Sequence, residues 1–249
     1  MIIKFISLIF LLVNFEINNW IELFNGESLD GWEVKIRGYD FGENYRNTFR
    51  VEDGSIKVSY EGYRKFGDRF GHLFYTKKEF KNYILSLDYK FSGYHLKGAP
   101  GWSIKNSGVM LHCQDPRSML KNQEFPVSAE AQLLGGVGAG ERPTANICTP
   151  GTDVDINGKK ADGHCINSIS KTYEDEWVNV KLIVYSDSLI HHVIQSDTVL
   201  TYTNLRVGGD FIPTNYGIEI GEKLSQGYIS LKSEGHPVEF KNIKILELL

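Results

Sequence analysis

The chain has 249 residues, of which 41 % are hydrophobic and 12 % aromatic, with 25 glycines against 7 prolines. This composition supplies a substantial core and many tight turns, and no Pro- or Ser-rich linker divides the chain, so we expect one domain. The formal net charge is -4 and the lysines and arginines are scattered. The sequence therefore lacks the basic stripe of a nucleic-acid-binding protein.

The N-terminus resembles an export signal. One early lysine precedes an apolar run from Phe5 to Val13, which has the length of a signal-peptide core and is too short to span a bilayer. We predict a signal peptide over residues 1–19, a domain over 20–249, and a periplasmic or extracellular location. No small-x-small cleavage pattern follows, so an uncleaved N-terminal anchor stays open as an alternative contact with the membrane.

The first half of the domain predicts strands and one aromatic loop. Phe49 to Tyr60 indicates two short strands around an Asp-Gly turn, and Asn82 to Phe91 alternates strictly between apolar and polar residues. A glycine-rich loop follows and carries Trp102. We predict that Trp102 stacks on a sugar ring, with the alternative that it only anchors its loop.

The stretch from Asn106 to Gly136 contains two strand-like runs with polar residues on one face of each. In the second run, Glu130 and Gln132 lie opposite Ala129, Ala131 and Leu133. If the two strands are adjacent, they present a common polar surface made of His112, Gln114, Glu130 and Gln132. The alternative is that these residues form the ordinary solvated face of an antiparallel sheet.

A long glycine-rich segment from Gly135 to Cys165 follows, with an Asn157-Gly158 hairpin turn. It lacks the Gly-Lys-Ser/Thr ending of a phosphate loop, and loops of this length tend to be functional. The segment brings Arg142 and His164 beside the central strands.

Three cysteines make an odd count. In an exported protein, Cys148 and Cys165 would form a disulfide that closes a loop of about 16 residues and is worth roughly 3 kcal/mol. Cys113 is then left over. Its place on the apolar side of its strand predicts a buried, inert thiol.

The last third of the chain predicts further short strands, and no long helical period appears after the N-terminal segment. The final two strands are joined by Lys232 to Pro237, a loop that carries Glu234 and His236. Regularly spaced strands with glycine-rich turns indicate an all-β fold, a two-sheet antiparallel β-sandwich of jelly-roll type.

Several motifs in order resemble one bacterial family, the 3-keto-disaccharide hydrolases, formerly a domain of unknown function. They are LFNGESLDGW, NSGVMLHC, FPVSAEAQLLGG, ERPTANICTPGT and GYISLKSEGHPVEFKNIKI. The resemblance covers about residues 21–249 and implies a concanavalin A-like jelly roll, an exported protein and a 3-keto sugar substrate. A separate sugar oxidoreductase would have to supply that substrate.

A 3-keto group acidifies the neighbouring C2 proton, so the glycosidic bond can be cleaved by proton abstraction and elimination, followed by addition of water. This route needs a base, an acid and a group that polarises the ketone. We predict Glu130 as base or acid, with His112 or His164 as its partner. The predicted substrate-binding residues are Gln132, Gln114, Arg142, Trp102, Glu234 and His236.

Three alternatives remain at this point. His112, Glu130 and His164 would form a divalent metal site if they converged, although their spacing is not diagnostic of one. A non-catalytic, lectin-like carbohydrate-binding module would use the same sandwich without a tuned acid and base. A structural surface protein would have no pocket at His112 and Glu130.

Overall fold

The computed structural model describes residues 19–249, and the predicted signal peptide lies almost wholly outside these residues. One sheet has ten strands, in the order β11 (Lys159–Lys160), β10 (Thr152–Ile156), β15 (Asp197–Val207), β14 (Leu189–Ile194), β13 (Val178–Tyr185), β6 (Asn82–Phe91), β17 (Val238–Glu247), β4 (Ser55–Val58) and β3 (Phe49–Glu52), with β1 (Ile21–Glu22) on β17. The other has seven, in the order β12 (Cys165–Ile166), β9 (Asn146–Cys148), β8 (Ala129–Leu134), β7 (Asn106–Cys113), β16 (Gly227–Ser233), β5 (Gly71–Phe80) and β2 (Trp32–Ile36).

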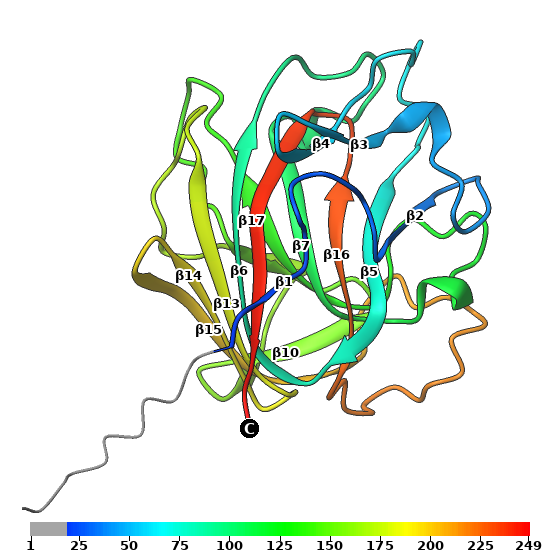
Figure 1. Cartoon of the computed structure of the whole chain (residues 1–249). Helices are drawn as coiled ribbons and strands as arrows, with labels where there is room; N and C mark the ends of the chain where they lie inside the picture. Colours follow the sequence, from blue (N-terminus) through cyan, green and yellow to red (C-terminus); the bar gives the residue numbers. More distant parts are fainter. Residues whose placement is uncertain (1–18) are drawn as a thin grey trace, which may run out of the picture.

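The two sheets pack face to face (Figure 1). All helices among residues 19–249 are single 3-10 turns, η1 (Tyr45–Asn47), η2 (Gly101–Ser103) and η3 (Pro116–Ser118), and none is long and apolar enough to cross a membrane. Every pair of neighbouring strands is antiparallel. The all-β, two-sheet antiparallel sandwich predicted from the sequence is confirmed.

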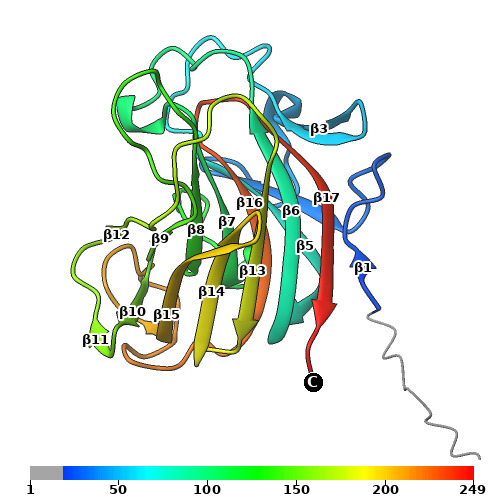
Figure 2. The ribbon, with the colours of Figure 1, turned by 90° about the vertical axis from the view of Figure 1, so that its left-hand side faces the viewer.

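The hydrophobic core lies between the sheets, because each inner strand alternates apolar residues inward with other residues outward. On β8, Ala129, Ala131 and Leu133 are buried in this core, as predicted. Strand β13 supplies Val180 and Leu182 from the opposite sheet (Figure 2). The intervening residues of β8 therefore lie on the outer face of the seven-stranded sheet.

Strand β7 does not keep the alternation predicted for it. His112 adopts a positive φ of 48°, and the register between β7 and β16 shifts at this point. Such a bulge turns the following side chains to the opposite face of the sheet. Gly227 lies opposite the bulge, and a Cβ there would come within 2.5 Å of the His112 carbonyl carbon, so only glycine fits without displacing the backbone.

Four strands of the seven-stranded sheet, β2, β5, β9 and β12, were not predicted from the sequence. Strand β5 begins with five consecutive buried residues and ends in the charged run that contains Lys77, Lys78 and Glu79. It therefore shows no period of two along its whole length, which is the signal that sequence reasoning uses for strands. Its position beside β16 completes the surface on which the site lies.

Candidate functional site

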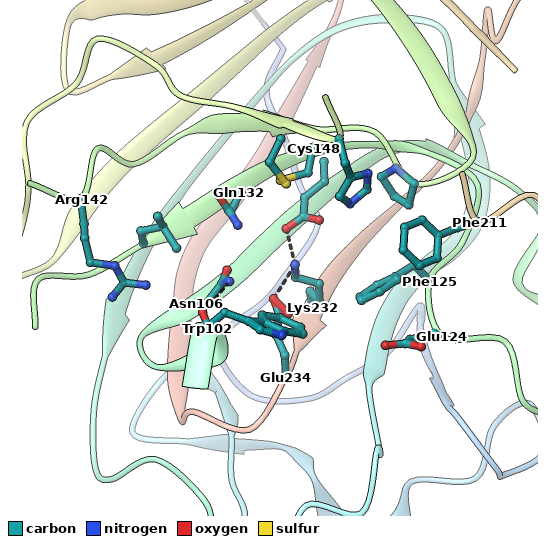
Figure 3. A pocket seen from close by; sticks show the side chains of 15 residues that line it. Trp102, Asn106, Glu124, Phe125, Gln132, Arg142, Cys148, Phe211, Lys232 and Glu234 are labelled. Carbon is teal, nitrogen blue, oxygen red and sulfur yellow. Dashed lines mark hydrogen bonds and ion pairs between the residues drawn. A yellow bond between two sulfur atoms is a disulfide. The ribbon is translucent and has the colours of Figure 1, made fainter. Parts of the chain in front are cut away.

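A cavity of about 360 Å³ lies on the outer face of the seven-stranded sheet. Its floor consists of outward residues of β7, β8, β9 and β16, and its walls come from the loops around residues 102, 125, 142, 164 and 211 (Figure 3). A volume above 300 Å³ is within the range of small-molecule sites.

Three charged side chains meet at the centre of the cavity floor. The Lys232 ammonium group on β16 forms ion pairs with the carboxylates of Glu130 on β8 and Glu234 just after β16. The distance from Lys232 Nζ to Glu234 Oε1 is 2.5 Å. Figure 3 shows Lys232 between the two carboxylates. We call Glu130, Lys232 and Glu234 the charged triad.

The triad forms across an intervening strand because that strand carries a glycine. Strand β7 lies between β8 and β16, and the Glu130 side chain crosses β7 over Gly108. A Cβ at Gly108 would lie 2.4 Å from Glu130 Oε1 and 2.8 Å from its Cγ. The missing side chain therefore leaves the space through which Glu130 reaches Lys232.

All three members of the triad are almost fully buried, with side-chain exposures of 3 % for Lys232, 4 % for Glu130 and 0 % for Glu234. Burial opposes the charged form of Lys232, but the two carboxylates outweigh it and raise the pKa of the ammonium group. Burial, reinforced by the Glu130 charge and opposed by Lys232, raises the pKa of Glu234 to about 7. Glu234 can therefore exchange a proton near neutral pH.

Aromatic side chains form one wall of the cavity. The Phe125 ring lies 5.6 Å from Lys232 Nζ and packs edge-on against Phe211, with 5.9 Å between the ring centroids. Trp102 lines the cavity with 55 % of its surface exposed, and its other face stacks on Phe70. Exposed aromatic faces of this kind are suited to packing against the apolar face of a sugar ring.

Away from Phe125 and Phe211 the cavity is polar: Arg142 lies at its far end, and Asn106 and Gln132 lie between Arg142 and Lys232 (Figure 3). The Gln132 side-chain oxygen accepts a hydrogen bond of 3.0 Å from Asn146 Nδ2, and this bond fixes the orientation of the Gln132 amide. Arg142 donates from Nη1 to the Gly135 carbonyl oxygen at 2.6 Å. Amide and guanidinium groups here offer hydrogen bonds to the hydroxyl groups of a ligand.

A disulfide joins Cys148 and Cys165, as predicted, and both residues line the cavity. It links β9 to the edge strand β12, directly after His164. Burial, with a smaller contribution from the Lys232 ammonium group, lowers the pKa of His164. His164 therefore lies in the cavity wall as a neutral imidazole, beside Phe211.

Six of the nine predicted site residues come together in this cavity, namely Glu130, His164, Gln132, Arg142, Trp102 and Glu234. The other three lie elsewhere. Gln114 is buried, and its amide holds the 114–127 segment together through Ser118, Gln123 and Val127. It is therefore placed to support the loop that carries Phe125 and does not line the cavity.

The predicted position of His112 on the polar face is wrong. The bulge turns its ring inward, where Nδ1 lies 2.7 Å from the Leu224 carbonyl oxygen and the ring packs against Tyr83. The same bulge sends Cys113 to the outer face, beside Met110 and Phe74. Cys113 is buried as predicted, but on the other side of its strand, and burial raises its pKa to about 12.

His236 also lies outside the cavity lining. Its ring stacks on His95 at 6.1 Å and packs against Phe91, with 4 % of the residue exposed. The metal site considered for His112, Glu130 and His164 does not form, because His112 points to the other face of the sheet. Among residues 19–249 no cluster of three or more His, Cys, Asp or Glu side chains is arranged to hold a metal ion.

Sequence reasoning missed Lys232, Phe125 and Phe211. The sequence predicts that Lys232 begins a loop, whereas β16 continues to Ser233 and its alternation places Lys232 outward. The available signal in the sequence was a lysine directly after the apolar run that ends at Leu231. Phe125 and Phe211 lie in irregular segments far apart in the chain, for which no local pattern predicts a shared wall.

Residues 19–246 match the model of a protein family described as the 3-keto-alpha-glucoside-1,2-lyase-like domain. The chain belongs to this family. It is also 24 % identical over 250 residues to a 3-keto-disaccharide hydrolase of Bacteroides thetaiotaomicron, which covers 92 % of this chain and 78 % of the relative.

Two solved structures are similar in fold. A putative glycosyl hydrolase from Parabacteroides distasonis has a TM-score of 0.54 and 19 % identity, over 92 % of this chain and 94 % of that one. The exoplasmic/lumenal domain of VIP36, bound to Ca²⁺ and Man3GlcNAc, has a TM-score of 0.51 and 10 % identity, over 94 % and 90 %. The family is carbohydrate-active, and its sandwich is shared with lectin-like proteins.

Proposed function

We propose that this protein cleaves the glycosidic bond of 3-keto-glycosides or 3-keto-disaccharides by elimination followed by hydration. The observation that carries the proposal is the charged triad: two carboxylates on one ammonium group, buried in the floor of a sugar-sized cavity. The names of the family and of the Bacteroides relative support the substrate class.

In the first step Glu130 removes the C2 proton, and the electron pair delocalises onto the 3-keto oxygen. The C1–O bond then breaks to give the enone, and Glu234 gives its proton to the departing oxygen. Lys232, which stays protonated, stabilises the negative charge on the keto oxygen. Glu234 is suited to the acid role because its pKa of about 7 keeps it largely protonated below neutral pH.

Water then adds to the enone, with its hydroxyl going to C1 and a proton to C2. Glu234, now ionised, accepts a proton from the water, and Glu130 returns its proton to C2. Both carboxyl groups are thereby restored. This mechanism differs from that of ordinary glycosidases, in which a carboxylate pair acts directly at C1.

The test is release of free sugar from 3-keto-disaccharides and aryl 3-keto-glucosides, compared with their unoxidised parents. We expect turnover only of the keto substrates, and a loss of about 10²- to 10⁴-fold in kcat for Glu130→Gln. Glu239→Gln on the outer side of the ten-stranded sheet, where Glu239 faces Lys90, is the matched control. Turnover of the parents at equal rates would contradict the elimination mechanism.

Lys232 needs two variants because removing one partner of a buried ion pair destabilises the fold by about 3–5 kcal/mol. Lys232→Arg keeps the charge and should fold, with a smaller loss of kcat than Lys232→Met.

Since Lys232 is held protonated, it should not form a Schiff base with the ketone. Borohydride treatment with a keto substrate should therefore leave the protein mass unchanged, and a reduced adduct on Lys232 would contradict the electrostatic role.

The second candidate function is a non-catalytic, lectin-like module, which the aromatic wall and the likeness to the VIP36 domain favour. A binding module does not require a buried acid that titrates near neutral pH. Saturable glycan binding that survives Glu130→Gln, with no turnover of any keto substrate, would establish this function in place of the enzymatic one.

We also propose that the protein is exported and acts after a sugar oxidoreductase that generates the 3-keto group. The disulfide supports export, because such bonds persist in oxidising compartments. Cell fractionation with and without residues 1–19 tests this location. Recovery of the full-length protein in the cytoplasm, with both cysteines reduced, would contradict it.

A further inference from the structure

The cavity has two cationic side chains, and only one of them is neutralised. Lys232 pairs with both carboxylates of the triad, whereas Arg142 has no carboxylate partner among residues 19–249. Glu124, the remaining acidic residue of the lining, pairs with Arg37 at 3.5 Å. Figure 3 shows Arg142 and Glu124 at opposite ends of the cavity. Arg142 therefore gives its end of the cavity a positive charge that no carboxylate of residues 19–249 neutralises.

Arg142 is held in place at this end. Its Nη1 donates to the Gly135 carbonyl oxygen at 2.6 Å, and its backbone N–H donates to Thr172 Oγ1 at 2.7 Å. These contacts leave Nε and Nη2 without a protein acceptor in the described part of the chain. Burial lowers the pKa of the guanidinium group, which nevertheless stays charged. A fixed and partly desolvated guanidinium group is preorganised to bind an anion.

Figure 3 shows Asn106 and Gln132 between Arg142 and Lys232, and each has one polar side-chain atom without a partner among residues 19–249. Asn106 is 4 % exposed, and its Oδ1 is buried without a hydrogen-bond donor. The Gln132 carbonyl oxygen is taken by Asn146, so its Nε2 remains as a donor toward the cavity. A buried acceptor without a partner is unfavourable, and a ligand hydroxyl group would supply the missing hydrogen-bond donor. This end is therefore built to receive a polar ligand with hydroxyl groups and a negative charge.

We propose that this end of the cavity binds an acidic sugar, a uronic acid residue whose carboxylate lies on Arg142 and whose hydroxyls contact Asn106 and Gln132. This proposal rests on the proposed function, in which the cavity binds a carbohydrate. The planar guanidinium fork matches a planar carboxylate.

The test is calorimetric binding of three unoxidised disaccharides: one that contains glucuronic acid, its neutral glucose parent and the 6-sulfated parent. None of these has a keto group, so binding is measured without turnover. We expect the uronide to bind roughly 10- to 100-fold more tightly than the neutral parent, as expected for a charge-assisted pair. Arg142→Gln should remove the difference and Arg142→Lys should keep part of it.

Arg117→Gln is the matched control, because Arg117 is exposed and pairs with Asp115 outside the cavity. Equal binding of the acidic and neutral sugars by wild type would overturn the inference, as would a preference that survives Arg142→Gln. Binding of the sulfate ester as tight as that of the uronide would overturn the carboxylate assignment. Preferred binding of the acidic sugar without turnover of 3-keto substrates would refute only the proposed reaction. Turnover of 3-keto substrates without preferred binding of the acidic sugar would refute only the acidic subsite.

Discussion

At the scale of single residues, Glu234 determines how the site responds to pH. The carboxyl group is fully buried beside Lys232 and close to Glu130, and its pKa is raised to about 7. Burial favours the neutral form, the Glu130 charge favours it further, and Lys232 opposes both. Small changes in pH near neutrality therefore switch the Glu234 carboxyl group between its protonated and its ionised form.

If protonated Glu234 is the acid, kcat/KM on a 3-keto-glycoside should fall as pH rises above about 7, because the proton is lost there. Glu234→Gln should lower kcat and remove this descending limb of the pH profile. Glu239→Gln should retain the limb, and its persistence in Glu234→Gln would show that another group donates the proton.

At the scale of elements, the site depends on the order of three strands. Strand β7 separates β8 from β16, and Glu130 and Lys232 meet only because β7 offers Gly108 at that position. The bulge at His112 lies further along the same strand and removes that side chain from the outer face. Strand β7 thus leaves space for the triad at Gly108 and turns the His112 side chain to the inner face of the sheet.

We predict that Gly108→Ala separates the pair without unfolding the protein. The new methyl group would overlap the end of the Glu130 side chain, which is flexible and can move aside. Turnover should fall toward the level of Glu130→Gln, measured on the same keto substrate. Gly101→Ala is the control, since a Cβ there meets nothing within 4 Å. Unchanged turnover in Gly108→Ala would mean that the triad does not need this space.

At the scale of the whole molecule, buried histidines set the pH range of stability. Burial lowers the pKa of His72 to about 3 and those of His192 and His236 to about 4, from an unfolded value of 6.5. The unfolded chain binds protons that the folded protein does not, so these groups cost stability as pH falls below 6.5. Glu234 acts in the opposite direction, since its raised pKa costs stability as pH rises from 4.5 through about 7.

The effect of the histidines on stability is larger than that of Glu234. Each group changes the free energy of unfolding by at most about 1.4 kcal/mol per pH unit. Among the groups with the largest pKa shifts, three histidines oppose one glutamate. Urea denaturation should therefore show stability falling by roughly 2 kcal/mol per unit between pH 6 and pH 5. His192→Gln should flatten this slope, whereas His191→Gln on the outer side of the same strand should not. Stability that rises on acidification would contradict the prediction.

Much of the fold and part of the site could be predicted, because the signals for them are local. The alternation of Ala129, Ala131 and Leu133 with Glu130 and Gln132 sets which face of β8 is buried, whatever strand lies beside it. Asn157-Gly158 joins β10 to β11 as predicted. Strand β5 was missed because residues buried on both faces carry no alternation.

The sequence by itself determined that this is a jelly-roll sandwich with Glu130 on an outer face, since alternation, turns and family motifs are properties of the chain. Only the tertiary structure decided which groups reach Glu130. Lys232 lies 102 residues away along the chain and arrives through strand order, while His112 is turned inward by a bulge. Both depend on the pairing of β7 with β16, and no local pattern specifies a pairing between distant strands.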